Sequence, residues 1–274
     1  MPRSAPTRTW RFRGRIAGWG TASGTRFVLG NWHTTPLGRF AGVMVQRPSG
    51  ERLLLAPSME VAEFVSATYQ FDAVEPVAVS VRRYAPDAAP AGGAARRSTG
   101  NSDSLSPADP VEPLPPTDAA APLPSAAPLP VAAPTTAGER WQVEAGPLSA
   151  HLRIGKRTPL GWLLRALPPA LAGAPWFSYV TDPIARVVLP GVRTRGSAGG
   201  GRREYYGAND LHRLQDAATT WDGEDLGAMV PIDPPVEFGF ASTPARPSVT
   251  DLLTTVRDRR AGPDELPGRS SRAG

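Results

Sequence analysis

The stretch Trp10-Arg11-Phe12-Arg13-Gly14-Arg15-Ile16 decides the fold class, because apolar and basic residues alternate along it. A period of two is typical of a β-strand that buries one face and keeps the other face in solvent. The arginines would form the solvated face. Two more strands are expected at residues 26–32 and 40–46.

Turn and capping signals extend this pattern through the first 85 residues. The turn Arg47-Pro48-Ser49-Gly50 separates two apolar runs and predicts a hairpin between residues 43–45 and 53–55. Ser58 can cap a following helix, in which apolar residues recur at helical spacing. Residues 77–81 then alternate again and predict another strand.

The second half of the chain predicts further strands and two short helices. The helices are expected at residues 158–167 and 209–221. The strands are expected at residues 141–145, 148–154, 176–180, 184–189, 236–240 and 249–256. Many short strands, frequent Gly and Pro and few helices indicate a mostly β fold. We expect an antiparallel β-barrel or sandwich with two or three short helices.

A Pro/Ala-rich segment, residues 86–138, interrupts this β-rich chain. It holds 12 of the 32 prolines and no aromatic residue. Such a segment cannot bury enough apolar surface to offset its ordering entropy, so we predict a disordered linker or insertion. Residues 257–274 are predicted to be a disordered tail. Residues 1–85 and 139–256 are expected to pack as one β-rich domain, with two separate small domains as the alternative.

The composition excludes several classes of protein. The chain has 274 residues and no cysteine, which removes disulfides, iron–sulfur clusters and cysteine nucleophiles. Its net charge of +5 arises mainly in residues 1–50, which contain eight arginines and no acid. A nucleic-acid-binding domain would spread its basic residues over a face, so nucleic acid is not an expected partner.

The same composition bears on the source and location of the protein. Lys156 is the only lysine, and the dominance of Arg, Ala, Pro and Gly is typical of a GC-rich bacterium. The apolar runs are shorter than the roughly 18–20 residues of a membrane helix, and no apolar signal segment follows the N-terminus. We therefore expect a cytoplasmic protein without membrane insertion.

The most unusual stretch, residues 191–212, combines Gly, Arg and Tyr. Glycines let backbone N–H groups surround an anion, and arginines pair with carboxylates or phosphates. This pattern predicts a loop over residues 191–203 that recognises a small acidic ligand, with a mobile surface loop as the alternative. The turn after residues 26–32 is a secondary site candidate. The candidate ligand-binding residues are Arg193, Arg195, Arg202, Arg203, Tyr205, Tyr206, Trp32 and His33.

Residues Arg203-Glu204-Tyr205-Tyr206-Gly207 resemble a segment of the acetoacetate decarboxylases, which are β-barrel enzymes. In that family a lysine follows shortly afterwards and forms a Schiff base with the substrate. Residues 208–212 of this chain contain no lysine, which argues against that chemistry. The resemblance covers five residues, and we assign no family from it.

Other catalytic and metal-binding patterns are weak. His33 and His212 could form a metal site with Asp210 or Glu204, but no closely spaced histidine pair supports it. No Gly-x-Ser-x-Gly motif marks a nucleophile. We therefore expect no metal and no cofactor. Glu204 and His212 are the candidates for a general acid or base.

The leading hypothesis is a non-catalytic protein that binds a small anionic or amphipathic ligand. An enzyme that acts on a small carboxylate-containing substrate on the same scaffold is the first alternative, and the sequence does not decide whether the protein is an enzyme. The second alternative is a scaffold or interaction protein that recruits a protein partner through residues 86–138.

Overall fold

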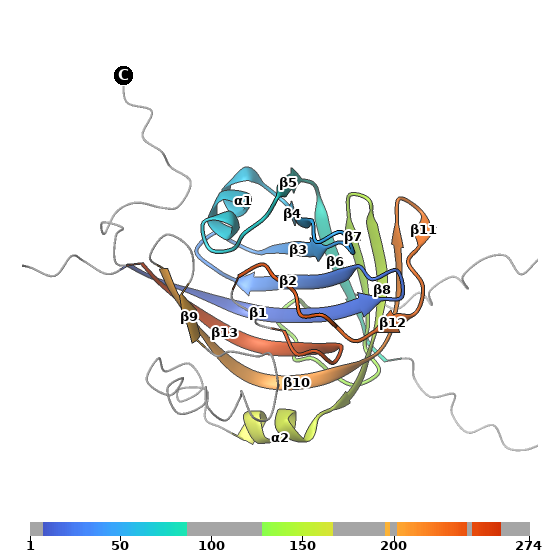
Figure 1. Ribbon diagram of the computed structural model, residues 1–274. Helices are drawn as coiled ribbons and strands as arrows, with labels where there is room; N and C mark the ends of the chain where they lie inside the picture. The colour runs from blue at the N-terminus through green and yellow to red at the C-terminus, as the bar shows by residue number, and fades with distance from the viewer. Residues whose placement is uncertain (1–7, 87–127, 167–194, 198–201, 240–242, 259–274) are drawn as a thin grey trace, which may run out of the picture.

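The computed structural model describes residues 8–86, 128–166, 195–197, 202–239 and 243–258. This part of the chain is mostly strands with two helices, and the strands form one curled, half-barrel sheet (Figure 1). The predicted fold class is therefore confirmed. The predicted strands at residues 176–180 and 184–189 lie outside the described residues.

The sheet brings together strands from both sides of the Pro/Ala-rich segment. Ten strands follow one another in the order β5-β4-β3-β2-β1-β13-β10-β8-β7-β6, while β9 and β11 pair with β10, and β12 pairs with β1. The strands are β1 (Arg8–Thr21), β2 (Arg26–Thr34), β3 (Phe40–Gln46), β4 (Arg52–Ala56), β5 (Ala73–Pro76), β6 (Val79–Tyr84), β7 (Arg140–Ala145), β8 (Leu148–Arg157), β9 (Arg195–Ser197), β10 (Arg202–Trp221), β11 (Glu224–Asp225), β12 (Met229–Val230) and β13 (Ser248–Asp258).

The first strand and the last strand lie side by side at the middle of the sheet. Strand β1 pairs antiparallel with β13, from Arg8 opposite Asp258 to Gly18 opposite Ser248. Strand β6 pairs antiparallel with β7 in the same way, although residues 87–127 separate them. Strands from before and after this segment thus belong to one hydrogen-bonded sheet.

Helix α1 (Met59–Ser66) joins the two strands that pair in parallel, β4 and β5. A parallel pair needs a crossover connection, and a helix usually supplies it. Ser58 caps the helix as predicted, because its hydroxyl accepts a hydrogen bond from the N–H of Val61 at 3.3 Å. Helix α1 lies over one face of the sheet (Figure 1). Its side chains Val61 and Phe64 are buried there.

The opposite face of the sheet carries the main apolar core. Because the sheet curls, side chains from strands near both of its ends share this core. The largest buried members are Trp19, Phe27, Leu29, Leu55, Trp141, Leu148, Leu152 and Ile154. Successive side chains of β1 point to opposite faces of the sheet. Trp19 therefore packs in this core, while Phe12 and Ile16 lie on the face that α1 covers.

The prediction that the arginines of β1 all lie in solvent is wrong for Arg15. Arg15 is only 3% exposed, and its guanidinium Nε lies 2.6 Å from Oδ1 of Asp251. Arg15 also donates to the carbonyl of Val131 at 2.8 Å and to that of Ala133. A buried arginine needs such partners, because desolvation of an unpaired charge is costly.

Residues 128–138, which the sequence analysis assigned to the Pro/Ala-rich insertion, lie against the sheet. Thr135 is completely buried, and Pro128 forms a β-bridge with Tyr84. Arg83 donates to the carbonyls of Val131 and Ala133 at 3.1 and 2.9 Å. Two buried arginines therefore hold the chain where it returns to the fold.

The predicted helix at residues 209–221 is wrong, because these residues belong to the 20-residue strand β10. Register shifts near residues 208–210, 212–214 and 214–216 show where the strand bulges. Each bulge inserts one extra residue, so the side chains that follow it change faces and the alternation of buried and exposed residues is interrupted. The resulting apolar spacing resembles that of a helix.

Two further sequence predictions need correction. Residues 236–239 are irregular and not a strand, and they pack on the face of the sheet that α1 also covers. Residues 195–197 and 202–203, expected in a loop, form strand β9 and the start of β10, which pair with each other. The second helix, α2 (Pro159–Ala166), agrees with its prediction.

Candidate functional site

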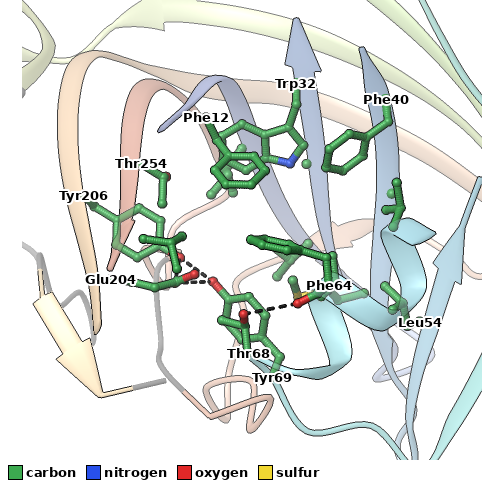
Figure 2. A pocket seen from close by; sticks show the side chains of 18 residues that line it. Phe12, Trp32, Phe40, Leu54, Phe64, Thr68, Tyr69, Glu204, Tyr206 and Thr254 are labelled. Atoms are coloured by element: carbon green, nitrogen blue, oxygen red, sulfur yellow. Dashed lines mark hydrogen bonds between the residues drawn. The ribbon is translucent and has the colours of Figure 1, made fainter. Parts of the chain in front are cut away.

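The strongest candidate site is a small cavity between helix α1 and the sheet. Side chains from α1 and from strands β1, β2, β3, β4, β10 and β13 line it. Its volume is about 60 Å³, which is room for a few water molecules. Six of its lining residues are aromatic, namely Phe12, Trp32, Phe40, Phe64, Tyr69 and Tyr206 (Figure 2).

Strand alternation brings these side chains to one face. On β13, Thr254 and Val256 are two residues apart and both line the cavity; on β1, Phe12 and Ile16 are four residues apart and share the same face. Antiparallel pairing then sets these residues beside one another, since Phe12 lies opposite Thr254. A one-residue change in register would turn the whole set to the other face.

Two glycines make room for Trp32 on the surface of the sheet. A Cβ atom on Gly30 would lie 2.6 Å from Nε1 of the Trp32 indole, and one on Gly14 would lie 2.8 Å from its Cε3. The indole therefore lies over backbone where no side chain stands. The position of the largest aromatic ring in the cavity depends on both glycines.

The apolar part of the cavity is built from rings that contact each other. The centroids of Phe12 and Phe64 are 5.0 Å apart, and those of Phe12 and Trp32 are 5.9 Å apart in an edge-to-face arrangement. Phe64 comes from α1, so the helix supplies one wall and the sheet supplies the other (Figure 2). Such contacts fix the rings beyond their burial alone.

The polar end of the cavity consists of Glu204, Tyr69 and Tyr206. Oε2 of Glu204 accepts hydrogen bonds from the Tyr69 hydroxyl at 2.9 Å and from the Tyr206 hydroxyl at 2.8 Å. The two hydroxyls also form a hydrogen bond with each other (Figure 2). Glu204 is only 3% exposed, so these bonds replace water around its carboxylate.

Two different elements bring this triad together. Glu204 and Tyr206 are two residues apart on β10 and therefore share a face. Tyr69 follows the end of α1, where its backbone N–H donates to the carbonyl of Val65 at 2.9 Å. The crossover from β4 to β5 thus delivers a hydroxyl to a carboxylate 135 residues away in the sequence.

Both tyrosine hydroxyls stay protonated over a wide pH range. Burial raises the pKa of Tyr69 and that of Tyr206 well above 10, and the negative charge of Glu204 raises both further. A phenol has one proton to donate. The two phenol protons are therefore shared among the three contacts of the triad.

The structure places the predicted site residues in different environments. Trp32, Tyr206 and Glu204 line the cavity. Tyr205 does not, and its ring lies 5.6 Å from the guanidinium carbon of Arg257. His33 is half-buried, and its Nδ1 lies 3.0 Å from the hydroxyl of Thr34.

The predicted arginine cluster is only partly described. Arg203 is exposed on β10. Arg195 and Arg202 belong to paired strands, but the description does not extend to their side chains. Arg193 lies outside the described residues. The anionic-ligand hypothesis for residues 191–203 therefore stays a prediction.

His212, the second catalytic candidate, does not line the cavity. It is 2% exposed on β10, and its Nδ1 lies 3.7 Å from Oδ1 of Asp210, so the two side chains are neighbours. Burial lowers the pKa of His212. Asp210 in turn accepts a hydrogen bond from Nε of Arg157 at 2.7 Å. Within the described ranges, no three His, Asp or Glu side chains are grouped to hold a metal ion.

Sequence reasoning missed Phe12 on β1, Phe64 on α1 and Tyr69, which follows α1. The helical spacing of Phe64 signalled only that it faces the core. No local pattern links Tyr69 to Glu204, because the contact arises from tertiary packing.

Together these features define a curled, mostly antiparallel sheet with an aromatic pocket that is closed at one end by an acid and two phenols. Comparison of the chain with known protein families, curated protein sequences and solved structures finds no match. Neither of the helices described here is long and apolar enough to cross a membrane.

Proposed function

We propose that the protein binds a small amphipathic molecule in the cavity between α1 and the sheet. The observation that carries this proposal is the division of the cavity into an aromatic body and one polar end. Ligand sites are commonly apolar hollows with a few placed polar groups. The apolar part of the ligand would lie against Phe12, Trp32 and Phe64, and its polar group would face Glu204.

The size of the cavity sets the affinity to look for. Burial of one CH₂ group contributes about 0.8 kcal/mol, so a body of five or six carbons contributes about 4–5 kcal/mol before binding costs. A binding free energy of about 4 kcal/mol corresponds to a dissociation constant of about 1 mM. Weak, rapidly exchanging binding is therefore expected from small probes.

Ligand-observed NMR suits this range. A panel of alcohols, amines, ketones and carboxylates with up to seven heavy atoms would be titrated against the full chain. We expect some members to bind with dissociation constants in the millimolar range. If no member of the panel binds, the proposal is wrong.

A variant that fills the cavity tests whether the probe binds there. Val65 lines the cavity from α1, so Val65→Phe should block binding. Val74 is 39% exposed on β5, and Val74→Phe should leave binding unchanged. Circular dichroism would verify that both variants fold. Equal binding by the two variants would place the bound probe elsewhere.

A second candidate function is an enzyme that uses Glu204 for proton transfer. The observation in its favour is a carboxylate that is 3% exposed at the end of an apolar cavity, where acid–base groups of enzymes are often found. The same NMR panel in D₂O would test it. Exchange of a probe's C–H for deuterium, lost in Glu204→Gln, would support catalysis, whereas unchanged spectra would support binding alone.

A further inference from the structure

We propose that the protein binds a single strand of nucleic acid on a basic surface formed by β1, β13 and β10. This surface, which we call the basic face, consists of Arg11, Arg13, Arg203, Tyr205 and Arg257. None of these residues lines the cavity under α1, so the inference goes beyond the proposed function.

Strand alternation sets these side chains on the face of the sheet that carries the main core. On β1, Arg11 and Arg13 are an even number of residues from Trp19, which packs in that core. Pairing extends this face across the next two strands, since Thr255 lies opposite both Arg11 and Tyr205. Figure 1 shows β1, β13 and β10 side by side.

The basic face brings like charges together. Arg203 and Arg257 lie directly opposite each other on β10 and β13. Like charges in this arrangement destabilise a sheet. Arg11 adds a third charge diagonally from Arg257, because it pairs with Thr255. Such local conflicts are expected where a protein carries a functional site.

The structure leaves this charge without acidic partners. Arg11, Arg13 and Arg203 are exposed, and their guanidinium groups form no hydrogen bond or ion pair within the described part of the chain. Among the same residues, Nε of Arg257 has no hydrogen-bond partner. The described acid on this face of β13 is Asp251, which an arginine of β1 already engages at 2.6 Å. The basic face can therefore receive an anion.

The dimensions of the basic face favour an extended anion. Four residues of rise along a strand and two spacings between strands cover about 13 Å by 10 Å. A single phosphate or carboxylate would not reach all four arginines, whereas a chain of phosphates would.

The aromatic ring favours nucleic acid among such chains. Tyr205 is half-buried between the arginines, and its ring centroid lies 5.6 Å from the guanidinium carbon of Arg257. Proteins that bind single strands combine a basic groove for the backbone with aromatic side chains on which bases stack. The basic face has both elements next to each other.

The sequence alone argues against this partner, because its basic charge is concentrated in residues 1–50. The fold removes that objection. Strand β13 lies between β1 and β10, so arginines from both ends of the chain share one face.

Fluorescence anisotropy with a labelled oligothymidylate of about 12 nucleotides tests the inference on the full chain. In a plot of log K against log salt, single-strand binding has a slope of about −0.7 for each neutralised phosphate. Contact by the four arginines predicts a slope of about −2.8, which is a roughly fiftyfold loss of affinity between about 50 and 200 mM salt. We expect a dissociation constant of about 100 µM or lower at the lower salt concentration. Absence of binding, or binding that salt does not weaken, would overturn the inference.

Two double variants with the same loss of charge assign binding to the basic face. Arg11→Gln with Arg13→Gln should reduce the slope by about 1.4, because two phosphate contacts are lost. The matched control is Arg82→Gln with Arg153→Gln, at exposed positions on β6 and β8, which should leave the slope unchanged. Circular dichroism would verify that both fold. Equal slopes for the two double variants would show that net charge alone binds the strand, and the inference would be wrong.

Tyr205 separates nucleic acid from other polyanions. Tyr205→Leu removes the stacking surface, so it should weaken the oligothymidylate at least about fivefold while changing the binding of inorganic polyphosphate less than about twofold. The same change for both polymers would mean that the face recognises charge without bases. Sedimentation of the protein with phosphatidylserine vesicles, when the oligothymidylate does not bind, would assign the face to a membrane surface. Either result would overturn the inference and leave the proposed function standing.

Discussion

The buried ion pair between Arg83 and Glu139 offers the sharpest test of how the fold is held together. Both side chains are at most 2% exposed, and Nε of Arg83 donates to Oε1 of Glu139 at 2.5 Å. The same oxygen accepts from the indole N–H of Trp141 at 2.8 Å. Oε2 accepts from the backbone N–H of Thr136 at 3.1 Å. We predict that Glu139→Gln strongly destabilises the protein.

The magnitude follows from what the substitution leaves behind. Removal of one partner from a buried ion pair costs about 3–5 kcal/mol, because the other charge stays buried without compensation. Arg83 keeps its backbone acceptors, among them the carbonyls of Val131 and Ala133, and the glutamine keeps one oxygen. The expected loss is therefore at the lower end, about 3 kcal/mol, which is roughly a hundredfold decrease in the folding equilibrium constant.

Equilibrium unfolding in urea, followed by tryptophan fluorescence, measures this loss. The matched control is Glu51→Gln, since Glu51 pairs with Arg47 at 3.1 Å on the surface, with side chains that are 47% and 38% exposed. An exposed pair of this spacing contributes about 0.5 kcal/mol or less. If Glu139→Gln costs no more than the surface control at an unchanged m-value, the reasoning about buried charge is refuted.

Three further predictions concern the site and the segment between the two halves of the sheet. Gly30→Ala should cost about 1–3 kcal/mol in urea unfolding and change ligand binding, because the new methyl group displaces Trp32. In a phenolate absorbance titration, Tyr69 and Tyr206 should resist ionisation above pH 10, and both should titrate normally in urea. Their raised pKa values stabilise the fold fully below pH 10, and this contribution is lost as the pH rises toward the folded-state values. Replacement of residues 87–127 by a short Gly/Ser linker should change the free energy of unfolding by less than about 1 kcal/mol. Tyr84 and Pro128 on either side already form a β-bridge, and the entropy of loop closure depends weakly on loop length. A larger loss of stability would show that the segment packs on the fold.

Local sequence signals predicted much of the secondary structure in the first half of the chain. Alternation, a Pro-Gly turn and a Ser cap act within a few residues, so β1, the hairpin from β3 to β4 and the start of α1 agree with the sequence. Strand β10 was not predictable in the same way. Its bulges occur in its pairing with two neighbouring strands, β13 and β8. They change the spacing of its apolar residues, which then resembles that of a helix.

The candidate site likewise contains some residues that the sequence suggested and others that only tertiary packing brings in. Glu204 and Tyr206 were candidates from the sequence because they follow a glycine-rich stretch, and Trp32 was a candidate because it precedes a turn at the end of an expected strand. Tyr69 was not a candidate, since its role depends on the crossover that places the end of α1 over β10. Arg15 likewise reads as a solvated cation until Asp251 and the returning chain surround it.

The sequence by itself determined that this protein is mostly β, that a Pro/Ala-rich stretch interrupts it, and which side chains share a face of each strand. These properties follow from composition and from the period of the backbone. Only the tertiary structure decided which faces meet, which arginines are buried, and that an acid and two phenols close one end of an aromatic cavity. Such contacts depend on strand register and on chain crossover between residues more than a hundred positions apart, and no local propensity encodes them.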